Sequence, residues 1–191
     1  MTIGFVTTRR RALLGMAAAC FGVLSIGVAS ADTTVARPYQ VTWPGGWEVS
    51  YLPSPTTHSG KNLGGERVRV LLKAEGVATV AAIELTYIPR SDKGRASLTE
   101  EFDLLRGALQ MGYERQKFKV NLTPTTALAM GGQTALKAEL SVTNEVVKLR
   151  QWMGVALSPQ FLYSLTFTAN DENFARYRPQ FEKIVRAIAF T

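Results

Sequence analysis

The sequence predicts an α+β fold in which an antiparallel sheet of about six or more strands is flanked by helices. Short runs of alternating apolar and polar residues recur along most of the chain, as in strands with one buried face. Residues 97–116 and the last twenty or so residues instead place apolar side chains three and four apart, as in amphipathic helices. Hydrophobic residues make up 46% of the 191 and charged residues 19%, so the chain has enough apolar material to fold.

Residues 1–31 have the pattern of a signal peptide ahead of one domain, residues 32–191. Three consecutive arginines (Arg9–Arg11) precede an apolar run over residues 12–28, and Ala29-Ser30-Ala31 is a small-residue cleavage site. A membrane-spanning helix is the alternative, but the run has 17 residues and no basic flank follows it. We therefore expect cleavage after Ala31, no permanent membrane anchor, and a periplasmic or secreted domain.

Two export routes fit the same leader. Arg10-Arg11 followed by Ala12-Leu13-Leu14 matches the twin-arginine pattern, which would mean export in the folded state. An ordinary Sec signal explains these residues equally well and is favoured, because nothing downstream indicates a cofactor loaded before export.

Composition excludes several classes of site. One Cys rules out a disulfide framework, and one His with one Cys rules out the usual zinc clusters. Without the leader, the remaining 160 residues carry 19 basic and 15 acidic side chains, a net charge of +4. That charge is too small and too dispersed to indicate a nucleic-acid partner. We expect no metal and no cofactor.

The first half of the domain is predicted to be mostly strands. Residues 39–43 and 47–52 alternate on either side of Pro44-Gly45-Gly46, which indicates a hairpin or a sheet corner. Residues 53–65 are rich in Gly, Pro, Ser and Thr and predict a surface loop. Residues 66–73 and 77–88 then form two strands, and Glu75-Gly76 between them suggests a tight turn.

The second half begins and ends with a helix. Ser97 and Glu100 form a capping box at the start of the helix over residues 97–116. A strand over 118–122 follows, and then three alternating runs ending near Phe167 predict an antiparallel meander. The last helix opens at Asn170 or Asp171, and Pro179 predicts a kink or a fresh helix start.

Four stretches carry a resemblance to a known fold family. They are GWEVSYLP with Trp47 and Pro53, Gly131-Gly132-Gln133 before a strand, YSLTFTA at 163–169, and FARYRPQFEKIVRAIAF at 174–190. This order resembles the PsbP-like α/β/α sandwich, which the photosystem extrinsic protein shares with a Ran-binding nuclear import factor and the periplasmic DcrB-like proteins. The chain also looks like a small, uncharacterised family of secreted proteins of Gram-negative bacteria. The resemblance implies the fold, and it carries over no binding residue, because this fold hosts unrelated binding roles.

Few residues are candidates for catalysis. His58 has no carboxylate near it in the sequence, and no serine stands in a nucleophile-elbow motif. Glu84 lies between Ile83 and Leu85 on a strand that should be well buried, where a cross-strand salt bridge is expected rather than acid catalysis. We therefore predict that the protein is not an enzyme.

A basic strand face is the most specific candidate binding surface. Arg67, Arg69 and Lys73 project from one strand, and Lys148 and Arg150 project from another beside Trp152. If the two strands were neighbours, these cations would share one face that could hold an acidic protein, a lipid headgroup or an anionic glycan. The alternative is a solvated face on which acids such as Glu84 and Glu139 pair with the cations across strands.

Aromatic residues offer a second candidate surface. Trp43, Trp47 and Tyr51 could form an exposed platform, although Trp47 at least is expected in the core.

Together these features predict an exported, non-enzymatic binding or accessory protein that contacts a protein or an envelope component. A chaperone or immunity-type neutraliser of a secreted effector is the alternative, and a hydrolase with an unusual carboxylate site is a third.

Overall fold

The structure is a computed structural model that describes residues 37–56, 62–73, 79–90 and 96–191. The predicted signal peptide, the Glu75-Gly76 turn and His58 lie outside these described residues. No helix in the described ranges is both long and apolar enough to span a membrane.

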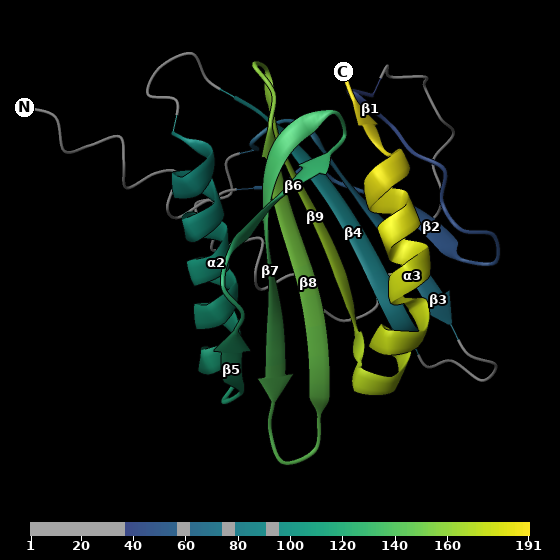
Figure 1. The fold of residues 1–191 in the computed structure, drawn as a ribbon, viewed down its shortest axis with the longest axis vertical. Coiled ribbons are helices and arrows are strands. Elements are labelled where there is room, and N and C mark those ends of the chain that lie inside the picture. The colour runs from purple at the N-terminus through teal and green to yellow at the C-terminus, as the bar shows by residue number, and fades with distance from the viewer. Residues whose placement is uncertain (1–36, 57–61, 74–78, 91–95) are drawn as a thin grey trace, which may run out of the picture.

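Ten strands and two helices make up the described chain (Figure 1). The strands are β1 (Tyr39–Gln40), β2 (Glu48–Leu52), β3 (Glu66–Lys73), β4 (Thr79–Pro89), β5 (Lys119–Leu122), β6 (Thr126–Met130), β7 (Gln133–Thr143), β8 (Lys148–Leu157), β9 (Phe161–Asn170) and β10 (Ala189–Phe190). The helices are α2 (Leu98–Arg115) and α3 (Asp171–Ala187).

Eight of the strands form one antiparallel sheet, so the α+β prediction is confirmed. Its order is β2-β3-β4-β9-β8-β7-β5, and β6 pairs with the remaining part of β7. The predicted meander corresponds to β7, β8 and β9, which pair in sequence with each other. Strand β6 was not predicted from the sequence.

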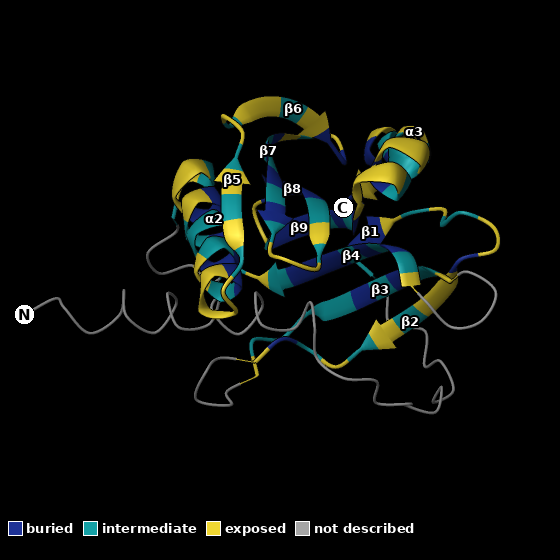
Figure 2. Cartoon of the chain, turned by 90° about the horizontal axis from the view of Figure 1, so that it is seen from below, coloured by how far each residue is buried: buried dark blue, intermediate teal, exposed yellow. Residues whose placement is uncertain are grey.

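The two helices cover opposite faces of this sheet (Figure 2). Helix α3 packs on β9, β8 and β4, where Phe174 and Phe181 lie against Phe167 in one core. Helix α2 packs on β8, β7 and β5 and buries Phe102 and Leu105 in a second core. Because the sheet has a core on each face, the alternate residues of its central strands are buried on both sides.

Both helices begin where the sequence predicts. The Ser97 side chain accepts a hydrogen bond from the Glu100 amide, and the Glu100 carboxylate accepts one from the Ser97 amide, so the predicted capping box is present. Asn170 caps α3 by accepting from the Asn173 amide. Helix α3 runs through Pro179 as one element, so of the two alternatives predicted at that proline, a kink or a fresh helix start, the second is wrong.

The first two predicted strands do not form a hairpin. Tyr39 and Gln40 pair with Phe190 and Ala189 of β10, whereas β2 pairs with β3 in the large sheet. The turn at Pro44-Gly45-Gly46 therefore carries the chain from one sheet to another, which is the sheet-corner alternative. The turn chemistry signals a change of direction, but the hydrogen-bonding partners of each strand are set by distant residues.

The two ends of the described chain meet over the sheet. The Tyr163 hydroxyl donates to the Pro38 carbonyl at 2.9 Å, and the Tyr163 ring stacks on Phe190 with centroids 3.9 Å apart. The Thr191 amide donates to the same Pro38 carbonyl, and the Phe190 amide donates to the Gly131 carbonyl. These contacts hold the segment that enters β1 above the α3 side of the sheet.

Candidate functional site

The six residues of the predicted basic face do not share a surface. Strands β3 and β8 are separated in the sheet by β4 and β9, so they are not neighbours. Val68 and Val70 of β3 are buried in the α3-side core, so Arg67 and Arg69 between them point to the opposite face. Arg150 and Trp152 of β8 instead face α3. The two groups of cations therefore lie on opposite sides of the sheet.

On β3, two of the cations are paired across strands. Arg69 donates to the Glu84 carboxylate on β4 at 3.1 Å, which confirms the cross-strand salt bridge expected for Glu84. Lys73 contacts the Glu48 carboxylate on β2 at 2.6 Å. This arrangement matches the alternative of acids that pair with the basic strand.

On β8, Arg150 is held between a carboxylate and a ring. It contacts Glu139 of β7 at 2.8 Å and lies 4.6 Å above the centre of the Phe174 ring of α3. Trp152 is 3% exposed, and its ring lies 4.9 Å from that of Phe181. Lys148 is exposed at the start of β8. Trp152 is thus a core residue and not part of an exposed basic face.

The described residues hold no cluster of acids suited to metal binding. Among them, no three His, Cys, Asp or Glu side chains lie close enough together to hold an ion.

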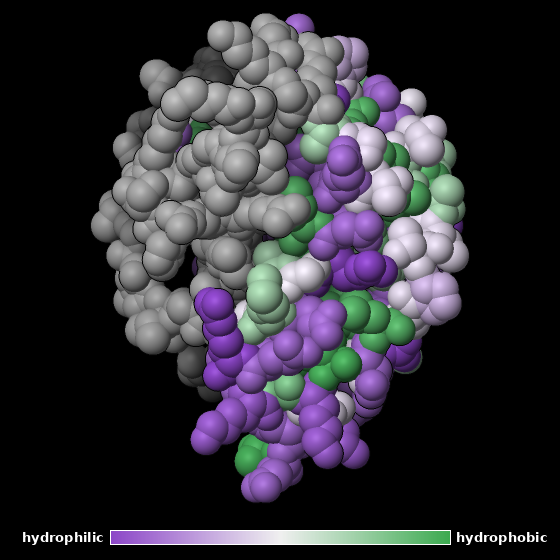
Figure 3. Space-filling view, turned by 90° about the vertical axis from the view of Figure 1, so that its left-hand side faces the viewer, coloured by the Kyte–Doolittle hydropathy of each residue, from purple (hydrophilic) through white to green (hydrophobic). Residues whose placement is uncertain are grey.

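The α2 side of the molecule shows hydrophilic residues with smaller hydrophobic groups between them over its described part (Figure 3).

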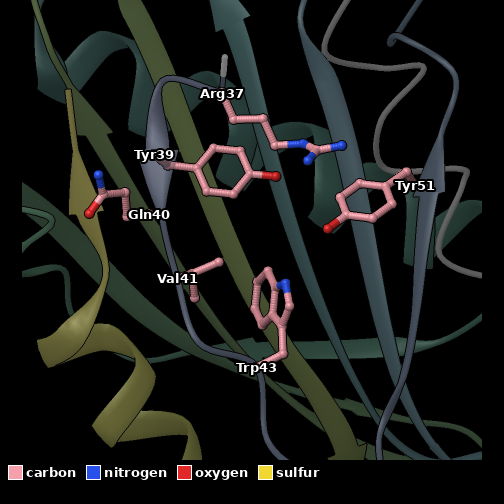
Figure 4. Close-up of a pocket in the computed structure, with 6 residues that line it drawn as sticks. All are labelled: Arg37, Tyr39, Gln40, Val41, Trp43 and Tyr51. Atoms are coloured by element: carbon pink, nitrogen blue, oxygen red, sulfur yellow. The ribbon is translucent and has the colours of Figure 1, made fainter. Parts of the chain in front are cut away.

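A hollow lies on the α3 side of the sheet, between β2 and residues 37–43, which we call the N-terminal segment (Figure 4). Its volume is about 360 Å³, and we call it the β1–β2 cleft. Its lining residues are Arg37, Tyr39, Gln40, Val41, Trp43 and Tyr51. Figure 4 shows Tyr51 on β2 facing Tyr39 and Val41 across the hollow, with Trp43 closing one end. Four of the six lining side chains are therefore aromatic or aliphatic, but most of the surface that the cleft exposes is polar.

Glu66 of β3 fixes the wall of the cleft that the N-terminal segment provides. Its carboxylate accepts from Arg37 Nε at 2.8 and 3.2 Å and from the Tyr39 hydroxyl at 3.0 Å. The Arg37 and Glu66 side chains are only 24% and 19% exposed, so water weakens this pair less than it would a surface pair. The segment is thereby bonded to the sheet through side chains.

The electrostatics of this cluster keep its groups in fixed protonation states. Burial raises the pKa of Tyr39, and the neighbouring Glu66 charge and hydrogen bond raise that pKa further. The hydrogen bond to Glu66 also raises the pKa of Arg37. Tyr39 therefore remains a neutral phenol and Arg37 a cation at physiological pH, and neither can act as a base.

The aromatic residues noted in the sequence have different roles. Trp47 is 9% exposed and meets the Tyr177 ring edge-on, so its predicted place in the core is confirmed. Trp43 is half-buried against the same core. Tyr51 is 51% exposed, and the Arg37 guanidinium lies 4.0 Å above its ring centre. Two of the three residues thus line the cleft.

The side of the cleft formed by Arg37 and Glu66 could not be predicted from the sequence. Arg37 precedes the first predicted strand, and Glu66 begins the predicted strand over residues 66–73. These two residues are 29 positions apart, so no local pattern links them.

Comparisons with known proteins identify a family and a fold. A family model described as a domain of unknown function (DUF4946) matches residues 38–190. A comparison with curated proteins gave no match.

Two solved structures share the fold at low sequence identity. PsbP (CyanoP) from Synechocystis sp. PCC 6803 is 14% identical, with a TM-score of 0.56 over 90% of this chain and 98% of that one. LpqN from Mycobacterium tuberculosis is 13% identical, with a TM-score of 0.52 over 80% of this chain and 83% of that one. The predicted PsbP-like fold is therefore confirmed.

Proposed function

The chain belongs to the DUF4946 family, and we propose that it is an exported, non-enzymatic binding or accessory protein whose contact site is the β1–β2 cleft. The partner is a protein or another component of the cell envelope. The basic residues of β3 and β8 are not part of this site.

The chemistry of the cleft carries the proposal. Its strongest polar group, the Arg37 guanidinium, is neutralised by Glu66, and its Tyr39 phenol is held protonated. The remaining lining is Gln40, which adds a neutral amide, and three residues that add apolar surface, Val41, Trp43 and Tyr51. A concave site that combines aromatic side chains with neutral or paired polar groups suits recognition, whereas general acid–base or nucleophilic catalysis requires a group that can exchange a proton or attack.

Two observations support a place in the cell envelope. The leader pattern of residues 1–31 favours export. LpqN, which has the same fold, is involved in cell envelope biogenesis.

Site-specific photocrosslinking tests the contact site. A photoreactive benzoylphenylalanine replaces Tyr51 in the cleft, and in a matched variant it replaces Val146, which is 90% exposed in the turn between β7 and β8. Both full-length chains are expressed in a Gram-negative host and irradiated in living cells. We expect a discrete adduct from position 51 that position 146 does not give. The same adduct from both positions, or none from position 51, would contradict the proposed site.

Cell fractionation tests export in the same cultures. We expect the chain in the periplasmic or secreted fraction, with Asp32 as its first residue by mass spectrometry. An intact leader in the membrane fraction would refute export by cleavage after Ala31.

A further inference from the structure

Strand β2 has an unpaired edge beside the cleft. All five of its residues, Glu48–Leu52, pair with β3 on one side. No other strand of the described chain pairs with β2, so β2 forms the end of the eight-stranded sheet. An edge strand presents backbone amides and carbonyls that another extended chain can bond.

Apolar side chains follow this edge on the cleft face. Val49 and Tyr51 are opposite Val70 and Val68 of β3, which belong to the α3-side core, so both project to that side. Val49 is 36% exposed and Tyr51 is 51% exposed. These are two of the four large hydrophobic residues that the described chain leaves exposed, and they stand two positions apart on one short strand.

Charges near this edge are already paired. Glu48 projects to the opposite face, where it contacts Lys73 at 2.6 Å. On the cleft face, Arg37 is bonded to Glu66. A neutral segment that approaches β2 therefore meets apolar side chains and backbone groups rather than an uncompensated charge.

We infer that the β1–β2 cleft recognises an extended polypeptide segment, which adds to the outer edge of β2 and places an apolar or aromatic side chain in the hollow. This inference rests on the proposed function and names the partner's chemistry. An added strand would lie about 4.8 Å from β2, and every second side chain would point to the cleft face. Main-chain hydrogen bonds would then give affinity, and the cleft would select the side chain.

The arrangement of the rings favours a peptide over a glycan. Sugar rings stack on flat, accessible aromatic faces, but the Arg37 guanidinium covers one face of Tyr51 at 4.0 Å. Of the other two rings at the cleft, Trp43 packs on the core and Tyr39 is 6% exposed. The hollow therefore suits insertion of a side chain better than stacking of a sugar ring.

Peptide selection followed by backbone methylation tests the inference. Random nine-residue peptides displayed on phage are selected on the full chain, purified as the expressing cell processes it. The tightest peptide is then synthesised with one N-methyl group at each backbone position in turn. We expect methylation at alternate positions to weaken binding at least tenfold and the intervening positions to tolerate it, because only every second amide of an edge-bound strand faces β2.

Protein variants locate the peptide. Tyr51→Ala removes a wall of the cleft and should weaken binding at least tenfold. Met111→Ala, which changes a residue 42% exposed on α2, should leave affinity unchanged. Hydrogen exchange provides a second readout, since the outward amides of β2 should become protected in the complex, while circular dichroism confirms that each variant folds.

Several outcomes overturn the inference. Selection of no peptide, equal sensitivity to methylation at all positions, or binding unaffected by Tyr51→Ala each rules out strand addition at β2. If crosslinking from position 51 nevertheless captures a glycan or lipid component, only this inference fails and the proposed contact site stands. If position 51 also gives no adduct, the proposed function fails with it.

Discussion

Replacing Glu66 by Gln should destabilise the protein by about 2 kcal/mol. The Glu66 carboxylate accepts from the Arg37 guanidinium at 2.8 Å and from the Tyr39 hydroxyl at 3.0 Å, and its side chain is 19% exposed. Hydrogen bonds to charged groups contribute roughly 1.5–3 kcal/mol each. Glutamine retains one acceptor oxygen but has no charge, so about one such interaction is lost and the partly buried Arg37 cation loses its counter-charge.

Urea denaturation monitored by tryptophan fluorescence measures this effect. Glu48→Gln is the matched control, because it removes the charge of a carboxylate that contacts Lys73 at 2.6 Å, but the two side chains are 53% and 43% exposed. An exposed pair of this kind contributes about 0–1 kcal/mol. We expect Glu66→Gln to lower the free energy of unfolding by about 2 kcal/mol, which in a thermal melt would lower the melting temperature by about 4–8 °C, and Glu48→Gln to lower both by a smaller amount.

The difference between the free energies of unfolding of the two variants tests whether Glu66 anchors the cleft wall. A cost below about 0.5 kcal/mol for Glu66→Gln, which is typical of an unimportant surface position, would show that Glu66 does not anchor the cleft wall. Equal costs for the two variants would show that burial does not strengthen the Glu66 pair.

Three further predictions test the ends of the chain and the helix caps. In urea denaturation, Gly131→Ala should lower the free energy of unfolding more than Gly132→Ala. Both glycines have positive φ, but only at Gly131 would the new Cβ overlap the Phe190 ring. Equal losses of free energy in the two variants would refute the close contact. Tyr39→Phe should reduce the fall in the free energy of unfolding above pH 10. A tyrosine whose pKa is raised in the folded state stabilises the fold below the unfolded-state pKa near 10, and this contribution is lost as the pH rises towards the folded-state pKa. If the free energies of unfolding of the two proteins changed in parallel with pH, this prediction would be contradicted. Asn170→Ala should cost about 1 kcal/mol by removing the α3 cap, whereas Asn170→Ser should restore most of it, as thermal melts would show.

Elements that depend on neighbouring residues were predictable from the sequence. The helix over residues 98–115 was predicted from a four-residue capping signal and one apolar stripe, both of which are local. The strands of the meander follow from two-residue alternation. Strand β6 was missed because its sequence, TALAM, has two alanines and no sustained alternation, and its conformation is fixed by pairing with β7.

The candidate basic face failed for a different physical reason. Alternation along a strand shows which residues are buried, but in a sheet with a core on each face it does not show which core they enter. The valines of β3 enter the α3-side core, so Arg67 and Arg69 face the other side. In β8 the residues that point to either face are buried along most of the strand, and Arg150 lies on the α3 side. The side on which each cation lies depends on the whole sheet order.

The cleft depends on contacts that join residues far apart in the sequence. Its outer wall is formed by residues 37–43. The Pro38 carbonyl in this wall accepts hydrogen bonds from the Tyr163 hydroxyl and the Thr191 amide. The wall is bonded again to β3 through Glu66. Each of the two described strands that border the hollow is paired on one side only, β1 with β10 and β2 with β3, and β2 is the longer, with five paired residues against two. The hydrogen bonds of Tyr163 and Thr191 to Pro38 therefore fix one wall, and the inferred peptide segment would add to the edge strand β2 opposite.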